Sequence, residues 1–177
     1  DVVTCVHELL FDFSVWEIFG ALCNGATVCV VPKKIYLSPP DIIKLCDRLN
    51  VTVLSQTPAA FAALEAEDRL LGRRLNKGIG NDAKNLKQPH PYLKSLRSIV
   101  FAGDKLDFSR LCSWFDRHDD SLTKMYNCYG ITETSVFSSI KRITSQNAKE
   151  ASEDDYPYFS LIGKPMRHND FVILNSV

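Results

Sequence analysis

Short apolar runs alternate with helical patterns along most of this chain. The helical patterns begin at Ser14, at Ser38 and Pro39, at Thr57 and Pro58, and at Asp107 or Ser109. Strands that alternate with helices form a parallel sheet with helices on both faces, so the sequence predicts an α/β fold. The runs that we expect to form the strands are residues 2–6, 26–31, 51–54, 98–102 and 123–127.

Two of these segments support detailed expectations. Ser14 is followed three residues later by Glu17, which is the spacing of a capping box, so we expect a helix from Ser14 that stops at Gly25. Residues 26–31 (ATVCVV) are a largely apolar run ended by Pro32, which is typical of a strand buried on both faces. A further strand is expected at residues 135–143.

Polar segments are expected to form loops. Residues 69–94 are rich in Arg, Lys, Asn and Gly, which favours a basic surface loop. Residues 78–83 within it fit the G-x-G-x-x-A dinucleotide pattern by letter, but no strand pattern precedes them and no helix pattern follows, so we expect no such site. Residues 144–157 are expected to form another loop, and 161–165 and 171–174 short extended pieces.

Composition limits the functions open to this chain. The 177 residues suggest one domain, and their formal net charge of +0 gives no bulk attraction to nucleic acid or to an anionic membrane. No apolar run has the length of a membrane span. The six cysteines form no C-x-x-C pair, which predicts free thiols in a reducing, cytoplasmic compartment. The chain starts without Met and ends in an apolar run, so we expect it to be part of a longer protein.

Polar residues follow several of the predicted strands. Ser55, Gly103 and Asn127 each come after a strand-like run, and Asp12 lies close after the first one. In open α/β sheets, ligands bind beyond the carboxyl ends of the strands. The sequence therefore predicts that these four residues share one pocket.

The densest group of polar residues lies at 126–134. Tyr129 offers a ring face for stacking, and Asn127 carries a donor and an acceptor that can bind a base edge. Thr132 and Glu133 supply hard oxygen ligands suited to magnesium, and Gly130 permits a turn. This combination indicates a nucleotide and magnesium site, although a polar turn that ends a strand has a similar composition.

Two motifs carry a resemblance to a known family. Residues 11–17 (FDFSVWE) and 127–134 (NCYGITET) resemble core motifs of the amino-acid adenylation domains of nonribosomal peptide synthetases. Weaker matches are 56–58 (QTP), 101–104 (FAGD) and 162–165 (IGKP), the last with Lys in place of the family's Arg. The order fits along nearly the whole chain and implies one flavodoxin-like subdomain, residues 1–177, with 69–94 as a loop insertion longer than the family's.

The resemblance implies a reaction and its partners. The family condenses an amino acid with ATP to give aminoacyl-AMP, with Mg²⁺ as cofactor, and passes the acyl group to the phosphopantetheine thiol of a carrier protein. The expected partners are the amino acid, the remainder of the adenylation domain and the carrier protein, and the need for an MbtH-like helper protein is left open.

The resemblance also implies roles for individual residues. Asp12 would pair with the α-ammonium group of the amino acid, and Phe11 would act as a gate beside the carboxylate. Tyr129, Gly130 and Gly103 would bind ATP, with Asn127 on the adenine edge, Thr132 on the phosphate and Glu133 on magnesium. The pocket walls would be Phe13, Trp16, Ser55, Val100, Ala102, Cys128, Val136 and Phe137. These walls carry no charge, so we expect a neutral side chain of small to medium size.

Other motifs of the family are missing from this sequence, and two alternatives stay open. We find no Gly/Ser/Thr-rich phosphate loop, no ribose-binding Asp and no catalytic Lys motif, so we expect the isolated chain to turn over little or no substrate. The first alternative is a fragment of an acyl- or aryl-acid ligase, whose substrates give no reason for an acid at Asp12. The second is a non-catalytic nucleotide-binding module of flavodoxin-like shape.

Overall fold

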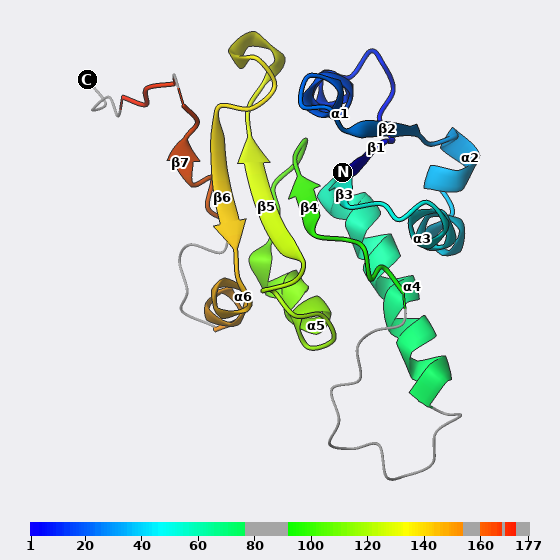
Figure 1. The fold of residues 1–177 in the computed structure, drawn as a ribbon. Coiled ribbons are helices and arrows are strands. Elements are labelled where there is room, and N and C mark those ends of the chain that lie inside the picture. Colours follow the sequence, from blue (N-terminus) through cyan, green and yellow to red (C-terminus); the bar gives the residue numbers. More distant parts are fainter. Residues whose placement is uncertain (77–91, 154–159, 168, 173–177) are drawn as a thin grey trace.

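The computed structural model describes residues 1–76, 92–153, 160–167 and 169–172, and these build one seven-stranded sheet (Figure 1). The strand order is β2-β1-β3-β4-β5-β6-β7. The strands are β1 (Val2–Cys5), β2 (Thr27–Val30), β3 (Val53–Gln56), β4 (Ser98–Phe101), β5 (Lys124–Tyr129), β6 (Ser139–Ile143) and β7 (Lys164–Pro165).

The sheet is mixed. The five strands β1 to β5 pair in parallel, whereas β6 pairs antiparallel with β5 and β7 antiparallel with β6. A parallel connection needs a crossover of a dozen or more residues, and the link between Tyr129 and Ser139 is shorter than that. The α/β fold class is therefore confirmed, with two antiparallel strands added to the expected parallel sheet.

Helices fill the connections where the sequence predicts them. The starts of three are confirmed: Ser38 stands at the N-cap of α3, the hydroxyl of Thr57 accepts from the amide of Ala60 at the start of α4, and the carboxylate of Asp107 accepts from the amide of Ser109. The helices are α1 (Phe13–Leu22), α2 (Lys33–Tyr36), α3 (Pro39–Arg48), α4 (Pro58–Asn76), α5 (Cys112–Phe115) and α6 (Ser145–Ala151), with 3₁₀ turns η2 (Phe108–Leu111) and η3 (Thr132–Thr134).

Two predicted loops contain helix. Helix α4 continues to Asn76, so the loop prediction is wrong for residues 69–76, and residues 77–91, with the G-x-G-x-x-A pattern, lie outside the described residues. The predicted loop at 144–157 contains α6, whose first turn is closed by reciprocal hydrogen bonds between Thr144 and Asn147. A polar sequence hid this helix because only its two alanines, Ala148 and Ala151, face the core.

Three other expectations need correction. The capping box at Ser14 is wrong, because α1 begins at Phe13 and Ser14 is itself buried. The run 26–31, expected to be buried on both faces, forms the edge strand β2, and its residue Val30 is 76% exposed. Of the predicted strand at 135–143, only Ser139–Ile143 pairs, because residues before it form a tight turn. Each error concerns an element's neighbours in space, which a local pattern does not contain.

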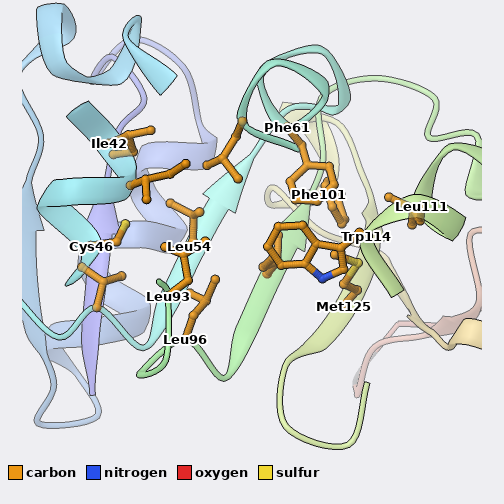
Figure 2. Close-up of a cluster of buried hydrophobic side chains, with 14 of the residues drawn as sticks. Ile42, Cys46, Leu54, Phe61, Leu93, Leu96, Phe101, Leu111, Trp114 and Met125 are labelled. Carbon is orange, nitrogen blue, oxygen red and sulfur yellow. The ribbon is translucent and has the colours of Figure 1, made fainter. Parts of the chain in front are cut away.

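The side chains of the sheet separate two cores. Along β4, Ile99 and Phe101 point to one side, whereas Val100 joins the cluster on the other. The first side, here called the layered face, packs against α3, α4, α5 and α6, with Phe61 and Trp114 near its centre (Figure 2). The opposite side, here called the α1 face, packs against α1. Within the described residues, no helix is both long and apolar enough to cross a membrane.

Candidate functional site

The two sequence motifs meet beyond the carboxyl ends of the central strands. The hydroxyl of Thr132, in the turn after β5, donates to the carboxylate of Asp12 over 2.8 Å. These residues are 120 positions apart in the chain, and the sheet brings them together because β1 and β5 are parallel and end at the same edge. Figure 1 shows α1 and the loop after β5 at that edge, at the top of the view.

Asp12 does not act as a conventional helix cap. It stands at the N-cap position of α1, yet its side chain makes no capping hydrogen bond. An Asp at this position normally accepts from an amide of the first turn. The carboxylate instead reaches Thr132, so it is presented to the neighbouring loop, where an incoming cation could meet it.

Three aromatic wall residues predicted from the sequence are in mutual contact. The ring of Phe13 lies 5.3 Å from that of Phe137 and 6.0 Å from that of Trp16, and the Trp16 and Phe137 rings are 5.7 Å apart. Phe13 and Phe137 are buried. They form an apolar wall beside Asp12.

The remaining predicted walls come from the strands and from the turn after β5, and all except Ser55 belong to the same cluster or pack against it. Val100, Ala102 and Cys128 are buried in it, and Val136 packs against it. Burial raises the pKa of the Cys128 thiol to about 12, so this wall is neutral at physiological pH. Ser55, beside Val100 in the sheet register, is fully buried, and its hydroxyl has no hydrogen-bond partner among the described residues. The structure therefore gathers all eight predicted walls on the α1 face or beside it.

The loop after β5 is tightly folded and strained. A Cβ on Gly130 would lie 2.2 Å from the carbonyl oxygen of Val136, so only glycine fits there. Val136 itself has φ of 73°, which is a true outlier for a β-branched residue. Such strain persists only where the surroundings enforce it and is frequent at functional sites. Here it turns Phe137 back toward Phe13.

The residues predicted to bind the nucleotide differ in their exposure to solvent. Tyr129 is half exposed, and Thr132 and Glu133 are exposed on η3. The side-chain amide of Asn127 is buried and donates to the carbonyl of Leu161 over 2.9 Å, so part of its hydrogen-bonding capacity serves the protein.

Phe11 and Gly103 approach each other closely. Gly103 has φ of 86°, and a Cβ there would lie 3.2 Å from the tip of the Phe11 ring. Phe11, the predicted gate, therefore lies against Gly103, which is predicted to bind ATP. This contact requires glycine for both its conformation and its lack of a side chain.

The site could hold a magnesium ion in the way that phosphate-binding sites do. Among the described residues, no three His, Cys, Asp or Glu side chains gather closely enough to hold a metal by themselves. Magnesium needs only one or two carboxylates when phosphates and waters complete its shell. The exposed carboxylate of Glu133 and the hydroxyl of Thr132 fit that donor set.

Sequence reasoning missed a buried ionisable pair beside the wall. The Glu17 carboxylate is fully buried and lies 2.9 Å from Nδ1 of His7. It also accepts from the backbone amides of Val6 and His7. One signal was present, because Glu17 is four residues after Phe13 and so shares its helix face.

Comparison with known proteins agrees with this geometry. A family model described as "AMP-binding enzyme" matches residues 1–177. Syringomycin synthase SyrB1 of Pseudomonas syringae pv. syringae is 37% identical over 166 residues, which cover 94% of this chain and 23% of that protein. A dimodular nonribosomal peptide synthase of Bacillus subtilis (strain 168) is 38% identical over 139 residues, which cover 77% of this chain and 5% of that protein.

A solved structure is similar over nearly the whole fold. It is the Vibrio cholerae adenylation domain AlmE in complex with glycyl-adenosine-5'-phosphate, with a TM-score of 0.65 and 25% identity, covering 93% of this chain and 25% of that one. The chain thus spans a quarter or less of the length of these three proteins. The resemblance to adenylation domains is confirmed, and the chain belongs to the family of AMP-binding enzymes.

Proposed function

We propose that this chain is the substrate-selecting part of an amino-acid adenylation domain of a nonribosomal peptide synthetase. The observation that carries the proposal is the hydrogen bond between Asp12 and Thr132. It joins the residue proposed to bind the amino acid to the residue proposed to bind the phosphate. The two reactants of an adenylation would therefore meet at one point.

The proposed chemistry follows from this arrangement. Asp12 pairs with the α-ammonium group and so holds the amino acid with its carboxylate toward the turn that carries Thr132. An oxygen of that carboxylate attacks the α-phosphorus of ATP, the bond to the β-phosphate breaks, and pyrophosphate leaves. Bound magnesium, held by Glu133, would neutralise charge on the phosphates. Tyr129 and Gly103 border the adenine, and Asn127 bonds its amino edge.

The proposed walls favour a neutral amino acid. Phe13, Trp16 and Phe137 occupy much of the α1 face, and the Cys128 thiol is uncharged. A charged substrate side chain would lose its hydration here without gaining a partner. The hydroxyl of Ser55, which has no hydrogen-bond partner among the described residues, could bond a polar substrate atom, and the Cys128 thiol is a weaker polar contact. Neutral side chains of small to medium size are the proposed class.

Transfer to a carrier-protein thiol, a requirement for the rest of the domain and a cytoplasmic location are part of the same proposal. The synthetase relatives support the first two. The six cysteines, all free, are consistent with a reducing compartment.

The test places residues 1–177 in a complete adenylation domain, in exchange for the matching segment, and measures ATP–pyrophosphate exchange over a panel of amino and aryl acids. We expect one neutral amino acid to give exchange. Asp12→Ala should raise its KM by about 100-fold, because removing one partner of a shielded charge pair costs about 2–5 kcal/mol. Asp41→Ala, which removes an exposed acid in the first turn of α3, is the matched control and should change nothing.

Two outcomes would contradict the proposal. Exchange only with acids that lack an amine would assign the chain to an acyl- or aryl-acid ligase and leave Asp12 without its role. If no acid in the panel gives ATP–pyrophosphate exchange, and circular dichroism shows that the graft is folded, the pocket assignment is refuted. The absorbance spectrum of the purified chain checks the nucleotide-binding alternative, because a bound flavin absorbs visible light.

A further inference from the structure

The segment that carries Asp12 has few anchors of its own. Between β1 and α1 the chain turns through residues 8–12, and Leu9 and Leu10 are 77% and 99% exposed. One local backbone hydrogen bond, from the amide of Phe11 to the carbonyl of Glu8, closes the turn. The segment is also held by the hydrogen bond from Thr132 to Asp12 and by the ion pair between Lys33 and Glu8, and His7 and Glu17 lie where it leaves β1.

Glu17 ties this segment to helix α1. Its carboxylate accepts from the amides of Val6 and His7 and from Nδ1 of the His7 ring, at 3.4, 3.2 and 2.9 Å. The Glu17 side chain is fully buried and that of His7 is 6% exposed. A buried carboxylate is costly unless its oxygens are hydrogen-bonded, so these three donors stabilise Glu17 and at the same time fix where β1 ends.

The His7 ring contacts both neighbours of Asp12 in the sequence. It stacks on Phe13 with centroids 4.2 Å apart and planes within 17°, and its edge faces Phe11 at 5.4 Å. Nδ1 is used by Glu17, and Nε2 is buried without a hydrogen-bond partner among the described residues. Retaining a buried imidazole with one nitrogen unpaired has an energetic cost that an apolar side chain would avoid.

We propose that His7 is a positioning residue for amino-acid binding: anchored by Glu17, its ring holds Phe11 and Phe13 and so fixes Asp12 between them. The proposal rests on the proposed function, in which Asp12 binds the α-ammonium group. His7 acts through these neighbours and does not touch the substrate. Its loss should therefore weaken binding of the amino acid and leave binding of ATP nearly unchanged.

A second histidine in the same chain serves as a matched control. His118 has Nε2 3.0 Å from the carboxylate of Asp68, its side chain is 8% exposed, and its ring stacks on Trp114 at 3.8 Å. It repeats the carboxylate, the imidazole and the stacked aromatic ring, with Arg117 as an additional partner of Asp68 at 3.1 Å. It differs in place, because it lies on the layered face, against α4 and α5, away from Asp12. Substituting it tests the effect of losing such a unit on stability alone.

The experiment compares His7→Leu, His7→Asn and His118→Leu in the complete adenylation domain that carries residues 1–177. We expect His7→Leu to raise the amino-acid KM at least tenfold, with the ATP KM within twofold of the parent. His7→Asn should recover most of the loss, because its amide nitrogen replaces Nδ1 as a donor to Glu17. His118→Leu should lower thermal stability and leave both KM values unchanged. An amino-acid KM unaltered by His7→Leu, or altered equally by His118→Leu, would overturn the proposal.

Hydrogen–deuterium exchange provides a readout that does not need activity. His7→Leu should increase the exchange rate of the amides of Phe11, Ser14 and Val15 at least tenfold, while the amides of β4 keep their protection. Unchanged exchange at these three amides would overturn the positioning role even if the graft proved inactive. A silent but folded parent graft would instead refute the proposed function, so the two failures are distinguishable. If His7→Leu does not fold, His7→Gln, whose amide reaches the Nε2 position, replaces it with the same expected increases.

Discussion

The two faces of the sheet differ in how they are packed and in what they carry. The layered face holds nearly all of the large side chains that are fully buried, among them Trp114, Phe101 and Phe108. Among the described residues of the α1 face, only Phe13 reaches that size and burial. The α1 face instead holds the proposed pocket walls and the strained turn at Val136. The comparison indicates that the layered face supplies most of the large buried side chains. It also carries an unpaired group, the indole N–H of Trp114, and a strained residue, Leu93 with φ of 59°, so the faces differ in packing and in the proposed pocket.

The helix on the α1 face also remains partly uncovered. Val15, Phe19 and Leu22 are 45%, 58% and 57% exposed, and they lie on one side of α1 at helical spacing. By contrast, Ile42, Ile43 and Cys46 of α3 are fully buried against the layered face. Within the described residues, the α1 face is thus the less completely packed of the two.

The largest expected effect distinguishes residues that stabilise the fold from residues that select the amino-acid substrate. Trp114→Ala should lower the free energy of unfolding by about 3–5 kcal/mol, because it empties the centre of the layered face. Phe13→Ala should also destabilise, but it should in addition let the graft accept larger amino acids in pyrophosphate exchange. Urea titration and the substrate panel measure the two quantities. A changed substrate range in Trp114→Ala would break the comparison between the faces.

An intermediate effect concerns alkaline pH. Burial raises the pKa of Cys46, on the layered face, and of Cys128, on the α1 face, to about 12 from an ordinary value of 9.0. A raised pKa means that the folded state favours the neutral thiol, so this stability is fully present below pH 9 and is lost as the pH rises toward 12. At pH 10 each thiol should cost the folded state about 1 kcal/mol.

Urea titrations at pH 8 and pH 10 check this expectation. Cys46→Ala and Cys128→Ala should each reduce the alkaline loss by a similar amount if both faces exclude water equally. If only Cys128→Ala reduces the decrease in unfolding free energy between pH 8 and pH 10, the α1 face is the one that is sensitive to base. Replacement of exposed Cys23 is the control for losing a thiol outside both cores.

The smallest expected effect concerns the strained turn. Ser135 has φ of 62° in the left-handed region, so Ser135→Gly should raise the free energy of unfolding by about 0.5 kcal/mol. Asn50 has φ of 50° on the way from α3 to β3, and Asn tolerates this region, so Asn50→Gly should change stability less. If Ser135→Gly is more stable but catalyses ATP–pyrophosphate exchange more slowly, the strained conformation contributes to activity. A loss of stability would contradict the reading of the turn as strained.

Local patterns in the sequence predicted the fold class and much of the site. The alternation of apolar runs with helical spacing predicted β1 to β5. Ser55 and Asn127, which we expected after the strands, lie inside β3 and β5 near their carboxyl ends. The motif resemblance predicted eight pocket walls, and seven of them, all except Ser55, belong to one cluster or pack against it. The alternation and the motifs each involve residues close together in the chain, so they can be recognised without knowledge of tertiary contacts.

Only the tertiary structure decided which groups pair across the chain. The partner of Glu17 is His7 and not Ser14, and the partner of Asp12 is Thr132 and not a helix amide. The edge position of Val30 and the reversed direction of β6 were decided in the same way. The physical reason is common to all four: a burial or a hydrogen bond between distant segments depends on which elements the sheet places side by side, and that order is not encoded in the spacing of neighbouring residues.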